Sequence, residues 1–263
     1  MRELPPDRYF AYLSWQAIAG MENKSEVVII QPLGAIEQHG RHLPLVVDTA
    51  ICLEVLGRAL TQLDPGIPAY CLPPLCYGKS NEHIEFPGTI TLSAQTLALV
   101  LIEVAESIYR AGFRKFALVN AHGGQPQVLE IVARDLRQKY RDFWVFPLFL
   151  WRVPNLAAEL LSNQELAQGI HAGDAETSAM LAILPKYVDM AQAIAEYAPA
   201  LGSSLLSLEG ALPYAWLTSD LSRSGVLGDP TGATAAKGEL LLASLAQGWV
   251  QVIEDIYRFK LPL

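Results

Sequence analysis

The chain has 263 residues, of which 51% are hydrophobic and 17% are charged, so it is long enough to bury a large core. Its formal net charge is −8 and no basic cluster stands out, which argues against a nucleic-acid partner or an anionic membrane surface. Charges interrupt the apolar stretches well before the length of a membrane span, and the N-terminus lacks the features of a secretory signal. Three cysteines without a CxxC pair are typical of buried thiols in a reducing compartment, so we expect a cytoplasmic protein.

Apolar runs alternate with amphipathic segments along the first part of the chain. The runs predict strands at 26–32, 68–77, 115–120 and 143–151. Helices are predicted from Asp48 to the Pro65-Gly66 pair, from the capping residue Ser93 to Gly112, and over 126–140, 175–184 and 233–257. The Gly-, Ser- and Pro-rich segment 198–230 predicts a long structured loop. This order predicts an α/β fold in which helices cover both faces of a mainly parallel sheet, as one domain over residues 1–263.

Polar side chains follow two of these predicted strands. The loop 33–47 carries Glu37, His39 and His42 and runs into Asp48, while His122 follows the strand at 115–120 directly. Ligands bind at the carboxyl ends of the strands in open parallel sheets, so we expect both loops to face the same rim.

All five histidines lie in loops or at element boundaries, and four of them have Glu or Asp nearby: His39, His42, His83, His122 and His171. One such histidine would more often be an ordinary hydrogen-bonded loop residue. Five out of five favour a metal site.

The candidate ligands combine imidazoles and carboxylates, which suits Zn²⁺, Mn²⁺ or Fe²⁺: Glu37, His39, Asp48, His122 and Glu176. Five ligands exceed what one catalytic zinc needs and fit two cations that share a bridging carboxylate. Several of these residues have simpler explanations. Asp48 and Asp174 are good helix N-caps, Glu176 suits the first turn of a helix, and His122 with Gly123 and Gly124 can form a tight turn.

Five motifs together resemble the creatininase (creatinine amidohydrolase) family: "PLGAIEQHGRHLPLVVDTAI", "EHIEFPGTITLS", "LVNAHGGQ", "HAGDAETS" and "SGVLGDPTGATAAKGE". They span residues 32 to 239 in the order of the family. The resemblance implies a three-layer α/β/α fold, a binuclear zinc or manganese centre and a homohexamer. It also implies hydrolysis of non-peptide or cyclic amide C–N bonds in a small-molecule substrate.

The resemblance also assigns roles to residues. Glu37 and His39 match the Glu-x-His ligands, Asp48 the bridging aspartate, and His122 the histidine of the Asn-x-His motif. His171 matches the family's proposed proton-transfer histidine, and Glu176 matches the glutamate five residues later. Both residues are therefore catalytic candidates.

Two positions depart from creatininase proper. Gly124 stands where that enzyme has a glutamate ligand, so Glu176 is the expected replacement, and Ala167 stands where it has a tryptophan on the loop that covers the substrate. The "HGG" form is more similar to a broader branch that includes a formamide deformylase and a peptidase of redox-peptide maturation.

The sequence therefore predicts a metal-dependent amidohydrolase. A deformylase, a small-peptide peptidase and a catalytically silent metal-binding oligomer are the alternatives, whereas a Rossmann nucleotide site is excluded because no GxGxxG follows a predicted strand. His42 either orients a metal ligand through its ring N–H or is a loop histidine. Glu82 and His83 either line the site or a subunit boundary, or belong to a structured loop. We expect the substrate pocket to be walled by 77–88, 151–170 and 198–230, with Gly123 and Gly124 near the substrate.

Overall fold

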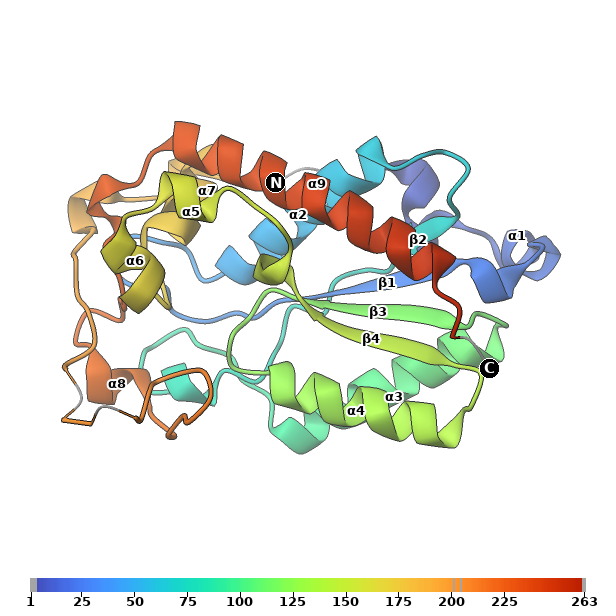
Figure 1. Ribbon diagram of the computed structural model, residues 1–263, viewed down its shortest axis with the longest axis horizontal. Helices are drawn as coiled ribbons and strands as arrows, with labels where there is room; N and C mark the ends of the chain where they lie inside the picture. Colours follow the sequence, from blue (N-terminus) through green and yellow to red (C-terminus); the bar gives the residue numbers. More distant parts are fainter. Residues whose placement is uncertain (1–3, 201, 204, 262–263) are drawn as a thin grey trace.

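A four-stranded parallel sheet forms the centre of the computed structural model, which describes residues 4–200, 202–203 and 205–261 (Figure 1). The strands, in the spatial order β2-β1-β3-β4, are β1 (Val28–Leu33), β2 (Ala69–Cys71), β3 (Lys115–Asn120) and β4 (Trp144–Phe149). Leu33 at the end of β1 pairs with Asn120 at the end of β3. The loops that leave these two strands therefore begin side by side at one edge of the sheet.

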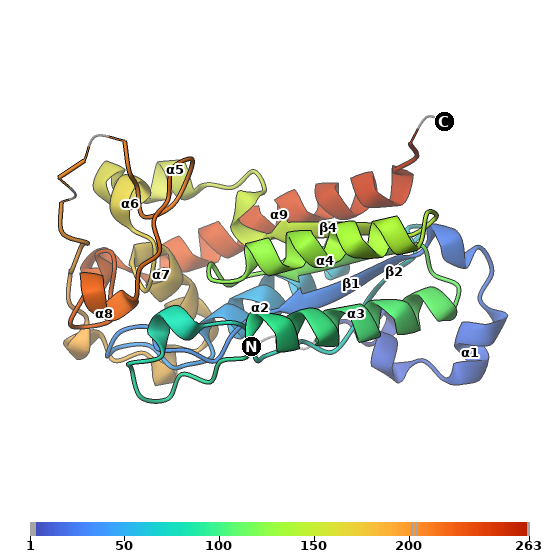
Figure 2. The ribbon, with the colours of Figure 1, turned by 90° about the horizontal axis from the view of Figure 1, so that it is seen from below.

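Helices cover both faces of this sheet, as Figure 2 shows, which confirms the predicted three-layer α/β/α arrangement. Helices α2 (Val47–Gln62), α7 (Asp174–Ile183) and α9 (Ala235–Arg258) pack on one face, and α3 (Ala94–Arg110) and α4 (Pro126–Lys139) on the other. Val28 and Ile30 of β1 point to the first face, and Ile29 and Leu33 to the second. A strand with helices on both sides needs apolar residues at successive positions, which is why β1 reads as an unbroken hydrophobic run.

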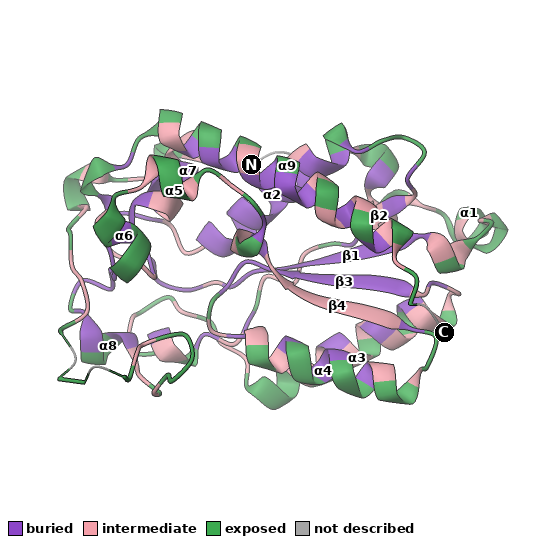
Figure 3. Cartoon of the chain, in the orientation of Figure 1, coloured by how far each residue is buried: buried purple, intermediate pink, exposed green. Residues whose placement is uncertain are grey.

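Burial follows the same layers (Figure 3). Every residue of β1 and β3 is buried, whereas the edge strand β4 is half-buried along its length. The two central strands end in Leu33 and Asn120, so polar groups that follow them start from the most rigid part of the molecule.

The predicted elements are close to the observed ones, with one strand clearly shorter. The expected strand at 68–77 forms only β2, because Pro73 and Pro74 have no N–H to donate to a neighbouring strand. Ser93 caps α3 as predicted, since its hydroxyl accepts from the Thr96 N–H at 3.1 Å.

Two predicted caps are wrong. Helix α2 begins at Val47 with Val46 in the capping position, so Asp48 lies inside the first turn and its side chain is aimed elsewhere. Helix α7 begins at Asp174 with Gly173 as its cap. The carboxylate of Asp174 instead accepts from the Ser178 hydroxyl and from Lys237 Nζ, which ties α7 to the start of α9.

Short elements join the layers around the rim: α1 (Trp15–Gly20), α5 (Ala157–Leu160), α6 (Asn163–Gln168) and α8 (Thr218–Leu221). Helix α8 interrupts the expected loop region 198–230, in which residues 201 and 204 lie outside the described part. Cys52 and Cys71 are buried free thiols and Cys76 is half-buried. Among the described residues, no helix combines the length and the apolar character that a membrane crossing requires.

We expect Gly238→Ala to destabilise the protein, although alanine is the better helix former. A Cβ at position 238 of α9 would lie 1.9 Å from the Ser178 carbonyl oxygen of α7, so the two helices would have to separate. The expected loss is about 1 to 3 kcal/mol in the free energy of unfolding, measured by urea denaturation. Gln247→Ala, at an exposed position of the same helix, is the control, and equal stability of all three proteins would contradict the packing argument.

Candidate metal centre

The five side chains predicted as ligands meet at the carboxyl edge of the sheet: Glu37, His39, Asp48, His122 and Glu176. The loop after β1 supplies the first two and the first turn of α2 supplies Asp48. The loop after β3 supplies His122, and the first turn of α7 supplies Glu176. Four segments far apart in the sequence thus deliver one cluster.

Asp48 lies between two imidazoles. Its Oδ1 is 3.6 Å from His39 Nε2, and its Oδ2 is 3.8 Å from His122 Nδ1. Glu37 Oε2 is 3.1 Å from His122 Nδ1, while Glu176 Oε1 is 3.8 Å from His39 Nε2. The donors therefore fall into two groups on either side of Asp48.

Several polar atoms in this cluster are buried and have no hydrogen-bond partner among residues 4–200, 202–203 and 205–261: Glu37 Oε2, His39 Nε2, Asp48 Oδ2 and His42 Nδ1. A buried polar atom left unpaired costs about 1 to 3 kcal/mol. Three of these atoms belong to residues of the predicted ligand set, and each lies within 4 Å of another candidate donor. Bound cations would pair these atoms, so the donor set fits a metal centre.

Hydrogen bonds to main-chain carbonyls set the orientation of the two ligand imidazoles. His39 Nδ1 lies 3.2 Å from the Glu37 carbonyl oxygen, and His122 Nε2 lies 2.9 Å from that of Lys79. A carbonyl oxygen only accepts, so these nitrogens carry hydrogen. The other ring nitrogen of each histidine faces the carboxylates and is available as a ligand.

The cluster attracts positive charge. Burial alone would raise the pKa of Glu37, but the imidazoles of His122, His83 and His39 outweigh it and hold the pKa well below its usual range. Burial would lower the pKa of His39, yet Asp48 and Glu176 raise it to about 9. Three carboxylates thus share a small buried space, and protons or divalent cations compensate their charge.

Burial raises the pKa of the Glu176 carboxyl to about 7, with Asp48 adding to this effect and His39 opposing it. Glu176 Oε2 accepts the Ala172 N–H at 2.6 Å, so Oε1 is the oxygen that faces His39. Ala172 has a φ of +54°, a conformation that an alanine adopts only under constraint.

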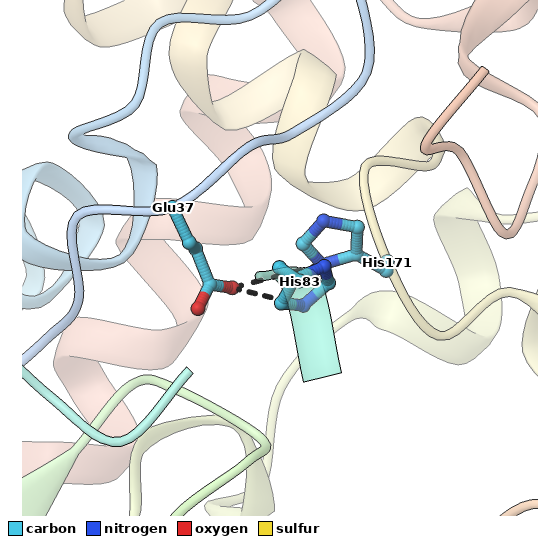
Figure 4. Close-up of side chains that lie close together, drawn as sticks. All are labelled: Glu37, His83 and His171. Carbon is cyan, nitrogen blue, oxygen red and sulfur yellow. Dashed lines mark ion pairs between the residues drawn. The ribbon is translucent and has the colours of Figure 1, made fainter. Parts of the chain in front are cut away.

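His83 and His171 form a second pair of imidazoles beside Glu37 (Figure 4). His83 Nε2 is 3.4 Å and His171 Nδ1 is 3.9 Å from Glu37 Oε1, and the two rings stack with centroids 4.2 Å apart. Burial lowers the pKa of His83 to about 4 and holds that of His171 well below its usual range. Both rings are therefore neutral near pH 7.

Gln38 holds this pair in place, and the sequence analysis did not single it out. The side-chain Nε2 of Gln38 lies 2.8 Å from His83 Nδ1 and donates to the Gly225 carbonyl oxygen at 3.0 Å. The main-chain carbonyl oxygen of Gln38 lies 2.7 Å from His171 Nε2. His171 Nε2 therefore donates to that carbonyl, which leaves Nδ1 as the basic nitrogen facing Glu37. The alternation Glu37-Gln38-His39 carried the signal, because the middle residue must face away from its two neighbours.

The remaining predicted residues occupy different places around the centre. His42 Nε2 lies 2.8 Å from the Thr177 hydroxyl and makes no recorded contact with a predicted ligand. Gly123 and Gly124 line the cavity, as expected. A Cβ at position 124 would lie 1.7 Å from Glu82 Oε1, so Glu82 fills the space beside Gly124 and Glu176 lies across the cluster next to His39.

The cluster opens into a cavity of about 1090 Å³. Its walls include residues from the three predicted segments and also from 120–130, 147–149 and 171–176. Aromatic side chains in these walls are Phe149, Trp151, Tyr214 and Trp216. The cavity reaches well beyond the metal ligands toward Arg152 and Glu209.

A parallel α/β/α fold with imidazoles and carboxylates gathered at the carboxyl ends of its strands is typical of α/β enzymes, which bind their ligands at that edge of the sheet. The sequence profile of the family Creatininase, described as creatinine amidohydrolase, matches residues 11–253. The chain belongs to the creatininase family and is a hydrolase of that family.

Two relatives illustrate the range of the family. The chain is 34% identical over 225 residues to the mycofactocin precursor peptide peptidase of Mycolicibacterium smegmatis, covering 84% of this chain and 82% of the relative. It is 30% identical over 264 residues to the creatinine amidohydrolase of Pseudomonas putida, covering 92% and 95% of the two chains.

Solved structures agree with the fold. A putative creatinine amidohydrolase from Bacteroides fragilis superposes with a TM-score of 0.79 at 24% identity, covering 99% of this chain and 100% of the other. A creatininase variant of Zn-Zn type superposes with a TM-score of 0.73 at 26% sequence identity. A manganese creatininase superposes with a TM-score of 0.71 at 25% sequence identity, and each alignment covers 95% of this chain and 98% of the other.

Glu196 fastens the segment that carries Gly225, and we expect its contribution to stability to depend on pH. Its carboxylate accepts from the Ser222 hydroxyl at 2.7 Å and from the N–H groups of Arg223 and Ser224 at 2.9 Å each. Burial alone would raise the pKa of Glu196, but these hydrogen bonds lower it to about 2 from the ordinary 4.5. A carboxyl with a lowered pKa stabilises the fold above pH 4.5, and this stabilisation is lost as the pH falls toward 2.

Glu196→Gln should therefore lower the free energy of unfolding by about 1 to 2 kcal/mol at pH 7. The difference from the wild type should shrink as the pH is lowered below 4.5, as measured by urea denaturation at several pH values. A difference that stays constant from pH 7 to pH 3.5 would contradict the assignment.

Proposed function

We propose that this chain is a metal-dependent amidohydrolase whose centre holds two divalent cations, zinc or manganese. The observation that carries the proposal is the set of unpaired buried atoms on Glu37, His39 and Asp48, three residues that lie together at the strand ends. The similarity to creatininases of zinc and manganese types supports the choice of metals.

In this proposal the two oxygens of Asp48 would help to hold one cation each. One would be held by His39 Nε2, Asp48 Oδ1 and Glu176 Oε1, and the other by His122 Nδ1, Asp48 Oδ2 and Glu37 Oε2. The distances between the donors in each group support this division, since the separations recorded within a group are between 3.1 and 3.8 Å. The candidate ligands come from segments spread over residues 37–176 and meet at one edge of the sheet. We therefore propose that residues 1–263 form a single domain.

Bound divalent cations supply positive charge that polarises an amide carbonyl and makes water a better nucleophile near neutral pH. The protein must then move a proton. Hydrolysis adds the hydroxyl of water to the carbonyl carbon and a hydrogen to the leaving nitrogen, so that the C–N bond breaks. The His171 ring is neutral, and its Nε2–H donates to the Gln38 main-chain carbonyl, which leaves Nδ1 facing the cluster. Nδ1 can therefore take a proton from water and deliver it to the leaving nitrogen.

A second candidate within the same chemistry is the hydrolysis of an amide bond in a short peptide. The cavity of about 1090 Å³ is at the upper end of the range for small-molecule pockets, and a single small ring would fill only a fraction of it. Trp151 and Trp216 in its walls suit a substrate with apolar side chains. The similarity to a mycofactocin precursor peptide peptidase favours this candidate over creatinine.

We also propose a homo-oligomer, a hexamer by family resemblance, in the cytoplasm. The outer sides of α3 and α4 support association, because Leu99 and Ile131 are each 60% exposed. Exposed apolar side chains on neighbouring helices are typical of subunit contacts.

Asp48→Ala should remove bound metal and activity while the fold survives. The substitution deletes the carboxylate whose two oxygens lie toward His39 and toward His122, and it relieves the burial of a charge. Elemental analysis should show loss of both cations, with a circular dichroism spectrum like that of the wild type. Asp135→Ala, at an exposed position of α4, is the control, and full metal occupancy in Asp48→Ala would rule out the bridging role.

Zinc- or manganese-loaded protein should hydrolyse at least one amide in a panel of short peptides, formyl amides, cyclic amides and creatinine. We expect kcat/KM to be highest for the peptides, because they fill the cavity, and chelation of the metal should abolish turnover. Turnover of creatinine alone would contradict the peptide candidate. The absence of turnover with every class, in protein that holds its metal, would refute the enzymatic proposal.

A further inference from the structure

A carboxylate outside the predicted ligand set lies against the metal centre. Glu82 belongs to the 3-10 turn Asn81–His83, and its side chain lines the cavity with 13% of its surface exposed. Its Oε1 lies 3.2 Å from His122 Nε2, and its Oε2 lies 3.9 Å from Lys79 Nζ. The proposed reaction assigns Glu82 no role.

The contact between Glu82 and His122 is on the far side of the imidazole from the cluster. The Lys79 carbonyl oxygen, 2.9 Å away, accepts from Nε2, so this nitrogen carries hydrogen. Nδ1 is then the nitrogen with the free electron pair, and it lies 3.1 Å from Glu37 Oε2. Glu82 thus faces an N–H group of His122. Glu37, Glu82 and His122 also lie close enough together to hold a cation, so the test must separate a positioning role from direct binding.

Gly124 creates the space for this contact. A Cβ at position 124 would lie 1.7 Å from Glu82 Oε1 and 2.6 Å from His122 Nε2. Both separations are far below van der Waals contact, so any side chain at this position would displace the carboxylate, the imidazole or both.

We propose that Glu82 is a positioning residue for His122. It accepts the Nε2–H, fixes the angle of the ring and makes Nδ1 a stronger donor to a divalent cation, and Gly124 is required because Glu82 occupies its side-chain volume. This inference rests on the metal centre proposed above. Carboxylates that hold a ligand histidine in this way typically change metal affinity by about 10- to 100-fold when they are removed.

The test measures zinc affinity by competition with a chromogenic chelator, zinc content by elemental analysis, and the Tm of the zinc-free protein. Glu82→Ala should weaken zinc binding by about 10- to 100-fold. Glu82→Gln keeps an acceptor oxygen without the charge, so it should weaken binding less than alanine does. The control is Glu85→Ala, an exposed position in the same loop, which should bind zinc like the wild type.

Each alternative gives a different result. Unchanged zinc affinity in Glu82→Ala, or a loss equal to that of Glu85→Ala, overturns the positioning role. Loss of one zinc per chain in Glu82→Ala and Glu82→Gln alike makes Glu82 a direct ligand and also overturns it. A wild-type chain that binds no zinc or manganese refutes the metal centre itself, which separates that failure from failure of this inference.

Gly124→Ala tests the same contact from the other side. It should weaken zinc binding at least as much as Glu82→Ala, because the new methyl group disturbs both the carboxylate and the imidazole. The double variant should bind no more weakly than Gly124→Ala alone, since both changes break one contact. Losses that multiply in the double variant would show that the two positions act independently.

Discussion

The structure of the site depends on the burial of Glu37 and Asp48 within reach of the same imidazole. Two buried carboxylates repel each other and lose their hydration, so the fold must surround them with groups that carry or accept positive charge. Four imidazoles lie 3.1 to 3.9 Å from the oxygens of Glu37: His39, His83, His122 and His171. The pairing of Leu33 with Asn120 makes the arrangement possible, because it fixes the distance between the two loops that supply these groups.

The fold and the gathering of the candidate ligands at one rim were largely predictable from local pattern. β1 and β3 are apolar on both faces, which marks them as central strands, and the polar residues directly after them could be assigned to one rim without knowing the packing. Glu176 was a candidate because it lies in a short segment rich in His, Asp and Glu, and the resemblance to creatininases then implied its role. The structure brings these side chains together, and their binding of metal stays a prediction.

What could not be predicted depends on contacts between distant segments. Asp48 looked like a helix cap, because its position in the sequence suits one, but the electrostatics of the cluster take its side chain away from the helix end. The sequence pattern did not show what Gln38 and Glu82 contact. Their importance comes from His171 and His122, which are 133 and 40 positions away along the chain, and only the packed structure brings them together. The proline pair after β2 was visible in the sequence, yet its effect on strand length was underestimated.

Ala172 gives the site a mechanical property. Its left-handed backbone is flanked on one side by the bridge between His171 and Leu227 and on the other by the N–H group donated to Glu176. A residue held in this conformation has no nearby relaxed state to move into without breaking those bonds. Ala172 therefore forms a rigid link between the His171 imidazole and the Glu176 carboxylate. In the proposed reaction, this link would keep the His171 ring and the Glu176 carboxylate at a constant separation whatever the size of the substrate.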